Sequence, residues 1–277
     1  MAALLALGAA LCWGVGDFLG GLTARHIAVL TVIVVSQSIG LAGLALWIGL
    51  GDEAFPGVVE VLPAAGAGVA VLIGVAALYR GLAIGAMGIV APISAAGPVV
   101  PLVVDAAHGT TPEALQWVGI GFVLLGIATL SREPSVSGRP QLASGAGLAI
   151  VAALGFGLFI VGIDAGADES APWAVLTART AAVPLAAIAA LVTSAPLLPP
   201  RALLPSLAAI GIVDTLANVL VATATTQGAA GIVAVLSALY PIVTVVLAWL
   251  VLGEKLSPSK RIGGVVALAG AAFVAAG

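Results

Sequence analysis

Three polar residues lie in stretches of the sequence that are otherwise apolar. Asp214 and Asn218 are four residues apart, so a helix places them on one face, and Arg179 lies in the preceding apolar stretch. Charged side chains within a membrane span are costly, and they pair with one another or face a polar cavity. Two interpretations stay open. The residues form a structural ion pair or hydrogen-bonded cluster, or they mark a polar point on the path of a substrate or proton.

Asp17 and Trp13 both lie within the first apolar stretch. Asp17 either reaches the cytoplasmic interface or pairs with Arg25 or Arg80, or else it faces a cavity and takes up a proton during a coupled cycle. Trp13 is far from both ends of the stretch, where its indole N–H needs a partner. It either packs in a core or lines a cavity that holds a planar or apolar substrate.

Two similar segments each carry a proline within an apolar stretch, Pro98 and Pro241. Proline lacks a backbone donor and kinks a helix, which leaves carbonyl oxygens without intrahelical partners. Such backbone is tolerated at membrane depth only where protein or a water-filled cavity covers it. We therefore expect the two prolines to line a cavity together with Ser94, Ser237 and Tyr240. A kink that serves packing alone is the alternative.

The sequence offers little for the chemistry of soluble enzymes. Cys12 is the only cysteine, and His26 and His108 have no neighbours at metal-ligand spacing. The glycines around Gly14 follow no strand, which argues against a phosphate-binding loop. We expect no metal, no cofactor and no nucleic-acid partner.

Composition indicates a membrane protein. Of the 277 residues, 62% are hydrophobic and only 8% are charged, and the mean hydropathy is +1.26. A soluble protein needs a polar surface, which this composition cannot supply. Because a span needs about 20 apolar residues, we predict an all-α integral membrane protein with ten transmembrane helices. They are Ala3–Thr23, Ala28–Leu50, Leu62–Ala83, Gly85–Ala107, Leu115–Leu130, Ser144–Ile163, Ala171–Leu191, Leu204–Thr225, Gly228–Leu252 and Lys260–Ala276.

The two halves of the sequence repeat each other. Aligning Pro98 with Pro241, an offset of 143 residues (241 − 98), also aligns the serines four residues before them. The first helices match at an offset of 141, which aligns Gly14 with Gly155, and the last helices match at 144. With five helices per half, the second half enters the membrane from the opposite side, as in the inverted repeats of many secondary transporters. We predict a first repeat over residues 1–131, a linker over residues 132–143 and a second repeat over residues 144–277, around a central cavity.

Basic residues indicate the orientation of the chain. Eight of the nine Lys and Arg residues lie in loops or at helix ends on the face opposite the N-terminus, and the ninth is Arg179. By the positive-inside rule, that face is cytoplasmic and both termini lie outside.

Four groups of motifs stand out along the chain: Trp13-Gly14 with Asp17-Phe18, Ala77-Leu78-Tyr79-Arg80, Ala91-Pro92-Ile93-Ser94, and Val235 to Pro241 with Leu252-Gly253-Glu254. They resemble the EamA-type transporters of the drug/metabolite transporter superfamily, over essentially the whole chain. The resemblance implies two inverted five-helix repeats around a cavity lined largely by the first, third and fourth helices of each half. It also implies transport of small organic solutes, often amino acids or other metabolites, commonly outward. The first half departs from the pattern because it lacks the Gly-Glu pair after its fourth helix.

We expect a secondary transporter in the cell membrane, not an enzyme, that moves small organic metabolites by alternating access. Amino acids, aromatic or apolar ones among them, are the expected substrates, with export as the direction and a proton as a candidate coupling ion. The expected partners are the substrate and the lipid bilayer, and the assembly is a monomer or homodimer. Two other classes stay open: an integral-membrane enzyme and a non-transporting membrane scaffold. The expected substrate-binding residues are Trp13, Asp17, Tyr79, Ser94, Pro98, Phe156, Arg179, Asp214, Asn218, Ser237, Tyr240 and Pro241.

Overall fold

All regular secondary structure in the described part of the chain is helical. This computed structural model describes residues 1–84, 90, 93–130, 145–253 and 257–277, with the backbone alone at residues 79 and 82–84. The predicted linker over residues 132–143 lies outside the described residues. The helices are α1 (Ala2–Ala24), α2 (Val29–Leu50), α3 (Val58–Ile84), α5 (Val99–Ala107), α6 (Ala114–Leu130), α7 (Ala146–Ala167), α8 (Ala171–Val192), η1 (Arg201–Leu203), α9 (Leu204–Thr225), α10 (Ala230–Ser237), α11 (Tyr240–Leu252) and α12 (Pro258–Ala276).

The helices have the length and the apolar surface that a bilayer requires. Eight segments of the described chain, with α10 and α11 counted as one, are long and apolar enough to cross a membrane. The shorter α6 and the segment that ends in α5 bring the number of spans to ten. A helix of 22 residues such as α2 is about 33 Å long at 1.5 Å per residue, which fits a hydrocarbon core of about 30 Å. The predicted all-α membrane fold is confirmed.

Two predicted spans are interrupted rather than continuous. The predicted ninth helix is divided into α10 and α11, with residues 238–239 between them. In the predicted fourth helix, residues 95–98 form turns before α5 begins. Proline explains both interruptions, since Pro98 directly precedes α5 and Pro241 lies in the first turn of α11. A proline has no N–H to continue the preceding helix but fits the first turn of a new one.

The hydrogen bonds at the two interruptions are the same. The N–H of Ile242 donates to the carbonyl oxygen of Leu239 at 3.0 Å. At the other interruption, the N–H of Val99 donates to the carbonyl oxygen of Ala96, also at 3.0 Å. Corresponding donors are 143 residues apart (242 − 99), which supports the predicted offset for this segment.

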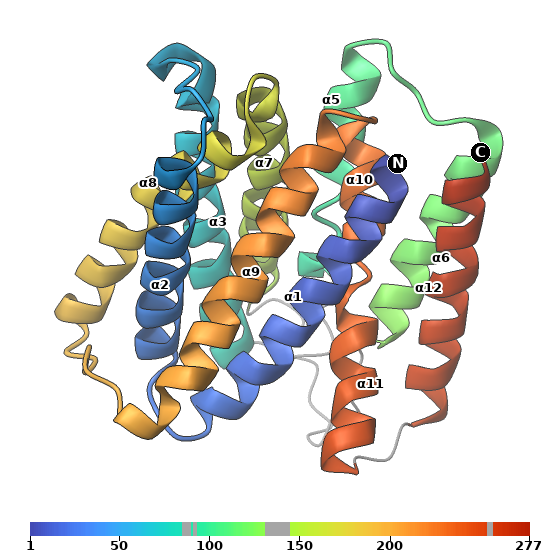
Figure 1. Cartoon of the computed structure of the whole chain (residues 1–277). Helices are drawn as coiled ribbons and strands as arrows, with labels where there is room; N and C mark the ends of the chain where they lie inside the picture. The colour runs from blue at the N-terminus through green and yellow to red at the C-terminus, as the bar shows by residue number, and fades with distance from the viewer. Residues whose placement is uncertain (85–89, 91–92, 131–144, 254–256) are drawn as a thin grey trace.

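Contacts between helices repeat with two-fold pseudosymmetry. Helix α1 packs on α9 as α7 packs on α3, and α2 packs on α9 as α8 packs on α3. The pairs α2 with α8 and α6 with α12 join corresponding helices of the two halves. Figure 1 shows α1 beside α9 and α6 beside α12 in one bundle. Two inverted five-span halves account for this pattern.

The register of the first helices differs from the prediction. Gly14 of α1 lies so close to Val243 of α11 that a Cβ on the glycine would overlap it, and Gly157 of α7 lies in the same way against Val100 of α5. The offset is therefore 143 (157 − 14), not the 141 that aligned Gly14 with Gly155. Both helices carry a Gly-x-Gly sequence, so a slip of two residues still aligns one glycine with another. The corrected register makes Trp13 the counterpart of Phe156.

The last helices follow the predicted offset of 144. An ideal Cβ on Gly119 of α6 would lie 2.6 Å from the carbonyl oxygen of Gly270 in α12, and one on Gly126 would lie 2.6 Å from that of Gly263. The two contacts are exchanged by the pseudosymmetry. Small residues let helix backbones approach closely in lipid, where packing drives association.

The two ends of the bundle differ in charge. Both termini lie at one end (Figure 1), called here the terminal face. The opposite end, called here the basic face, carries Arg25 after α1 and Arg201 before α9. An even number of spans requires the termini to share a side.

Candidate functional site

An aromatic pair lies at the middle of α1. Trp13 and Tyr240, the first residue of α11, are in edge-on contact, with ring centroids 6.3 Å apart and 79° between the ring planes. Gly14, beside Trp13, lets the backbones of α1 and α11 approach closely. The hydroxyl of Thr244 donates to the carbonyl oxygen of Gly14 at 3.2 Å. The helix break thus brings two predicted site residues together.

The serines beside the two breaks bond within their own segments. The hydroxyl of Ser94 donates to the carbonyl oxygen of Val90 at 2.8 Å, and that of Ser237 to Ala234 at 3.1 Å. Both residues are buried. Their hydroxyls satisfy backbone acceptors near the ends of interrupted helices. Substrate contact through them stays a prediction.

The repeat counterparts of Trp13 and Tyr240 do not form a second aromatic pair. Phe156 corresponds to Trp13, and it lies beside Gly97, 3.2 Å from where a Cβ would be. Gly97 is 143 residues before Tyr240 (240 − 97), so a glycine stands where the second half has tyrosine. The side chain of Tyr79 lies outside the described residues.

A buried ion pair joins α8 and α9. Nη2 of Arg179 lies 2.7 Å from Oδ2 of Asp214, so the predicted contact is present. The same oxygen accepts from the amides of Gln37, at 2.9 Å, and Asn218, at 3.3 Å. Arg179 also donates to the side-chain oxygen of Gln37. These four side chains, called here the polar network, connect α2, α8 and α9.

Two polar atoms of the polar network have no hydrogen-bond partner within it. Its arginine is 5% exposed and its aspartate 23%. Nε of Arg179 is buried and has no partner among the described residues. All side-chain bonds that Asp214 accepts within the described chain go to Oδ2, which leaves Oδ1 for a further donor.

Gln37 is the functional candidate that the sequence analysis missed. Helix α9 touches α2 one residue before Gln37, and α3 touches α8 one residue before Arg179. The two residues are therefore repeat counterparts, 142 residues apart (179 − 37). The sequence signal that could have identified Gln37 was an amide side chain at the repeat counterpart of Arg179.

Asp17 lies close to the polar network but outside it. Gly16, the residue before Asp17, packs against α9, the helix that carries Asp214. Asp17 makes no hydrogen bond or ion pair within the described chain. The expected alternative, a pair with Arg25 or Arg80, is therefore not formed between these described side chains.

The side of α1 that carries Asp17 is buried near the terminal face and exposed near the basic face. Ala6 and Ala10 on this side are 0% and 3% exposed. Trp13 is half-buried, whereas Asp17 and Gly21 are exposed. No described atom of a neighbouring segment lies within 4 Å of an ideal Cβ at Gly21. Trp13 thus marks where this side of the helix changes from closed to open.

This side of α1 faces the bundle rather than the lipid. Gly16 packs on α9 and Gly14 packs on α11, to either side of it. Leu4 and Leu11 lie on the opposite side by the helical period of 3.6 residues, and they are 71% and 56% exposed. The exposed part of α1 therefore lies on the side of the helix between its contacts with α9 and α11.

The corresponding part of α7 is closed. Asp17 and Gly20 of α1 correspond to Ile160 and Ile163 of α7, which are 6% and 0% exposed. Because the halves are inverted, this part of α7 lies toward the terminal face. Among the described residues, this side is therefore exposed on α1 toward the basic face and buried on α7 toward the terminal face.

Comparison with known proteins agrees with this architecture. A model of the EamA-like transporter family matches residues 1–132 and again residues 143–276. The chain belongs to the EamA-like transporter family. A protein of known crystal structure has the same fold, with a TM-score of 0.79 and 18% identity over 99% of this chain and 96% of its own. A comparison with curated proteins found no match.

Membership makes this EamA-like protein a multi-pass membrane transporter, not an enzyme. Its two halves each match the same family model, as expected of an internal repeat. The site of an EamA-like transporter must serve passage across the membrane, so the unequal exposure of corresponding sides of α1 and α7 is the relevant geometry.

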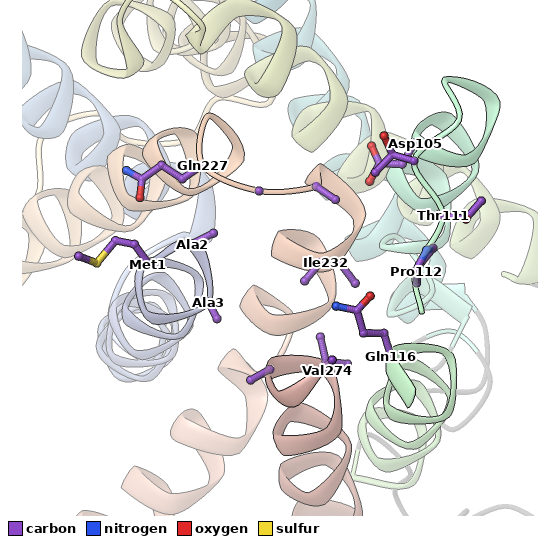
Figure 2. Close-up of a pocket in the computed structure, with 15 residues that line it drawn as sticks. Met1, Ala2, Ala3, Asp105, Thr111, Pro112, Gln116, Gln227, Ile232 and Val274 are labelled. Carbon is purple, nitrogen blue, oxygen red and sulfur yellow. The ribbon is translucent and has the colours of Figure 1, made fainter. Parts of the chain in front are cut away.

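A separate pocket of about 300 Å³ lies at the terminal face of this EamA-like transporter. Figure 2 shows Met1, Asp105, Gln116 and Gln227 around it. Asp105 of α5 accepts a 2.7 Å hydrogen bond from the N–H of Gly231 in α10. This pocket contains none of the predicted substrate residues, and it lies on the outside of the closed end.

Proposed function

We propose that this EamA-like transporter is a secondary transporter that exports small organic metabolites across the cytoplasmic membrane by alternating access. Amino acids, aromatic or apolar ones in particular, are the proposed substrates. The repeats over residues 1–131 and 144–277 move against each other, and residues 132–143 link them.

The observation that carries the proposal is the unequal exposure of corresponding sides of α1 and α7. Asp17 and Gly21 of α1 are exposed, while Ile160 and Ile163 of α7 are buried. In an inverted repeat, exchanging the conformations of the two halves moves the opening to the other side of the membrane. One structure therefore implies a second state, in which α7 is open at the terminal face and α1 is closed.

The proposed direction of transport is export, and the charge distribution supports it through the orientation of the chain. The positive-inside rule assigns the basic face to the cytoplasm, so the opening along α1 faces the cytoplasm and is ready to receive an internal solute. A gradient of the substrate, or of a coupled proton, supplies the energy. This arrangement supports export.

The aromatic pair suits a substrate with an apolar group. Trp13 is half-buried at the closed end of the opening and contacts Tyr240. Binding pockets for small molecules combine apolar and aromatic walls with a few polar groups, and the polar network is the polar side of this site. Phe156 takes the place of Trp13 in the exchanged state.

The test is transport by purified protein in proteoliposomes, screened over amino acids and related metabolites. We expect flux of at least one apolar or aromatic amino acid. Trp13→Ala and Tyr240→Ala should lower that flux while the purified variants remain folded. Trp47→Ala is the matched control, since Trp47 is 57% exposed at the end of α2.

Two results would contradict the proposal. Full flux in both aromatic variants would place the site away from the α1–α11 contact. Flux that depends on Trp47 as strongly as on Trp13 would show that loss of any tryptophan, rather than loss of this site, reduces transport.

A further inference from the structure

We propose that Asp17 recognises a protonated amine, so that this transporter selects substrates that carry a cationic nitrogen beside an apolar or aromatic group. The inference rests on the proposed function, because it assigns a substrate class to the same opening along α1.

The first step is the charge balance of the site. Arg179 is already paired with Asp214 at 2.7 Å, so these two charges compensate each other. Asp17 has no hydrogen-bond or ion-pair partner within the described chain. Among the described residues, the Asp17 carboxylate therefore has no counterion. Unpaired intramembrane charge is costly, and binding a cation removes that cost.

The second step is access. Asp17 is exposed, and an ideal Cβ at Gly20 or Gly21 would have open space around it. The same side of α1 is buried from Ala10 toward the terminal face. A solute that enters from the basic face therefore meets Asp17 before it reaches Trp13 at the closed end.

The third step is what lies next to the carboxylate. Trp13 precedes Asp17 by four residues, so the indole lies one helical turn further into the opening on the same side of α1. Its partner Tyr240 adds a second aromatic ring. Aromatic faces attract cations and cover apolar groups. An ammonium group on Asp17 with an apolar body on Trp13 satisfies both parts of the site.

The fourth step is selectivity against uncharged analogues. A hydroxyl in place of the ammonium leaves the Asp17 charge uncompensated, and sites built for a polar partner reject analogues that lack it. The ammonium of a zwitterionic amino acid meets the same requirement.

The experiment measures binding to the purified full chain by isothermal titration calorimetry at neutral pH. The probes are 2-phenylethylamine and 2-phenylethanol, which differ in the amine and the hydroxyl. We expect the wild-type protein to bind the amine about tenfold or more tightly, as for hydrogen bonds to charged groups. Asp17→Asn should bring the ratio of the two affinities to about one, and Asp17→Glu should restore part of it.

The control variant is Asp52→Asn, which removes an exposed carboxylate from the loop after α2. It should keep the wild-type ratio of affinities. Size-exclusion profiles and thermal midpoints establish that each variant is folded. An amine preference that persists in Asp17→Asn overturns the proposal. So does equal binding of both probes by the wild type, which would show that a proton alone neutralises Asp17.

Proteoliposome flux separates this inference from the proposed function. Amine-selective binding that depends on Asp17, without flux of any screened solute, supports the recognition site and contradicts transport. Flux of solutes that does not change in Asp17→Asn, with no amine preference in binding, supports transport and overturns the recognition site.

Discussion

Arg179 carries a positive charge that is 5% exposed within the bundle, and its compensation depends on one oxygen of Asp214. Removing one member of a buried pair costs about 3–5 kcal/mol because the other charge is left unpaired, although water and snorkelling reduce this within membranes. We expect Asp214→Asn and Arg179→Gln each to lower thermal stability, and the double variant to lose less than the sum. Thermal unfolding in one detergent measures all three. Strict additivity would mean that the two charges do not interact.

Gln37 contributes hydrogen bonds to this pair without contributing charge. Its loss in Gln37→Leu leaves the ion pair in place but removes two bonds to charged groups. We expect a loss of about 1–3 kcal/mol, smaller than that of Asp214→Asn, in the same unfolding measurement. A loss as large as that of Asp214→Asn would show that the amide, not the charge pair, dominates the network.

At the scale of residues, the informative feature of the sequence was a charged residue within an apolar segment. Arg179 and Asp214 stand out in apolar segments, and their contact is predictable from similar depth in consecutive helices. Gln37 is uncharged, so it carries no comparable signal. The absence of a hydrogen-bond or ion-pair partner for Asp17 among the described residues depends on how α1 is rotated. The sequence leaves that rotation open because its Gly-x-Gly pattern fits two registers.

At the scale of helices, close approach of α1 and α11 depends on Gly14. A Cβ there would overlap Val243 and lie 2.7 Å from the carbonyl oxygen of Tyr240, while one at Gly20 has open space. Alanine favours a helix over glycine by about 0.5–1 kcal/mol at either position, so the comparison isolates the contact. We expect Gly14→Ala to lower the thermal midpoint and Gly20→Ala to leave it unchanged or raise it. Equal midpoints would contradict the α1–α11 packing.

The extent of the spans was predictable, because a bilayer demands about 20 apolar residues wherever the chain crosses it. The division of the ninth span was only half predicted. Pro241 indicated a kink, but the structure has two helices, with the second starting one residue before the proline. Proline prevents the hydrogen bond that would continue the helix, but it does not determine the shape of the break. Neighbouring helices determine that shape.

At the scale of the whole molecule, we predict from the positive-inside rule that the basic face is cytoplasmic. The loop with Asp52 lies at the terminal face, and the loop with Leu198 lies at the basic face. In a Cys12→Ala background, a cysteine at position 52 should react with an impermeant thiol reagent in intact cells. A cysteine at position 198 should react only after permeabilisation. The reverse pattern would place the termini in the cytoplasm, and the opening along α1 would then face outward.

The central claim is that the two halves exchange conformations, and cysteines at the repeat counterparts Gly20 and Ile163 test it most directly. Gly20 lies beside open space at the basic face, and Ile163 is 0% exposed toward the terminal face. In the Cys12→Ala background, thiol labelling should be fast at position 20 and slow at position 163. Adding a transported solute should slow the first and speed the second. Labelling that changes in the same direction at both positions, or at neither, would contradict alternating access by the two repeats.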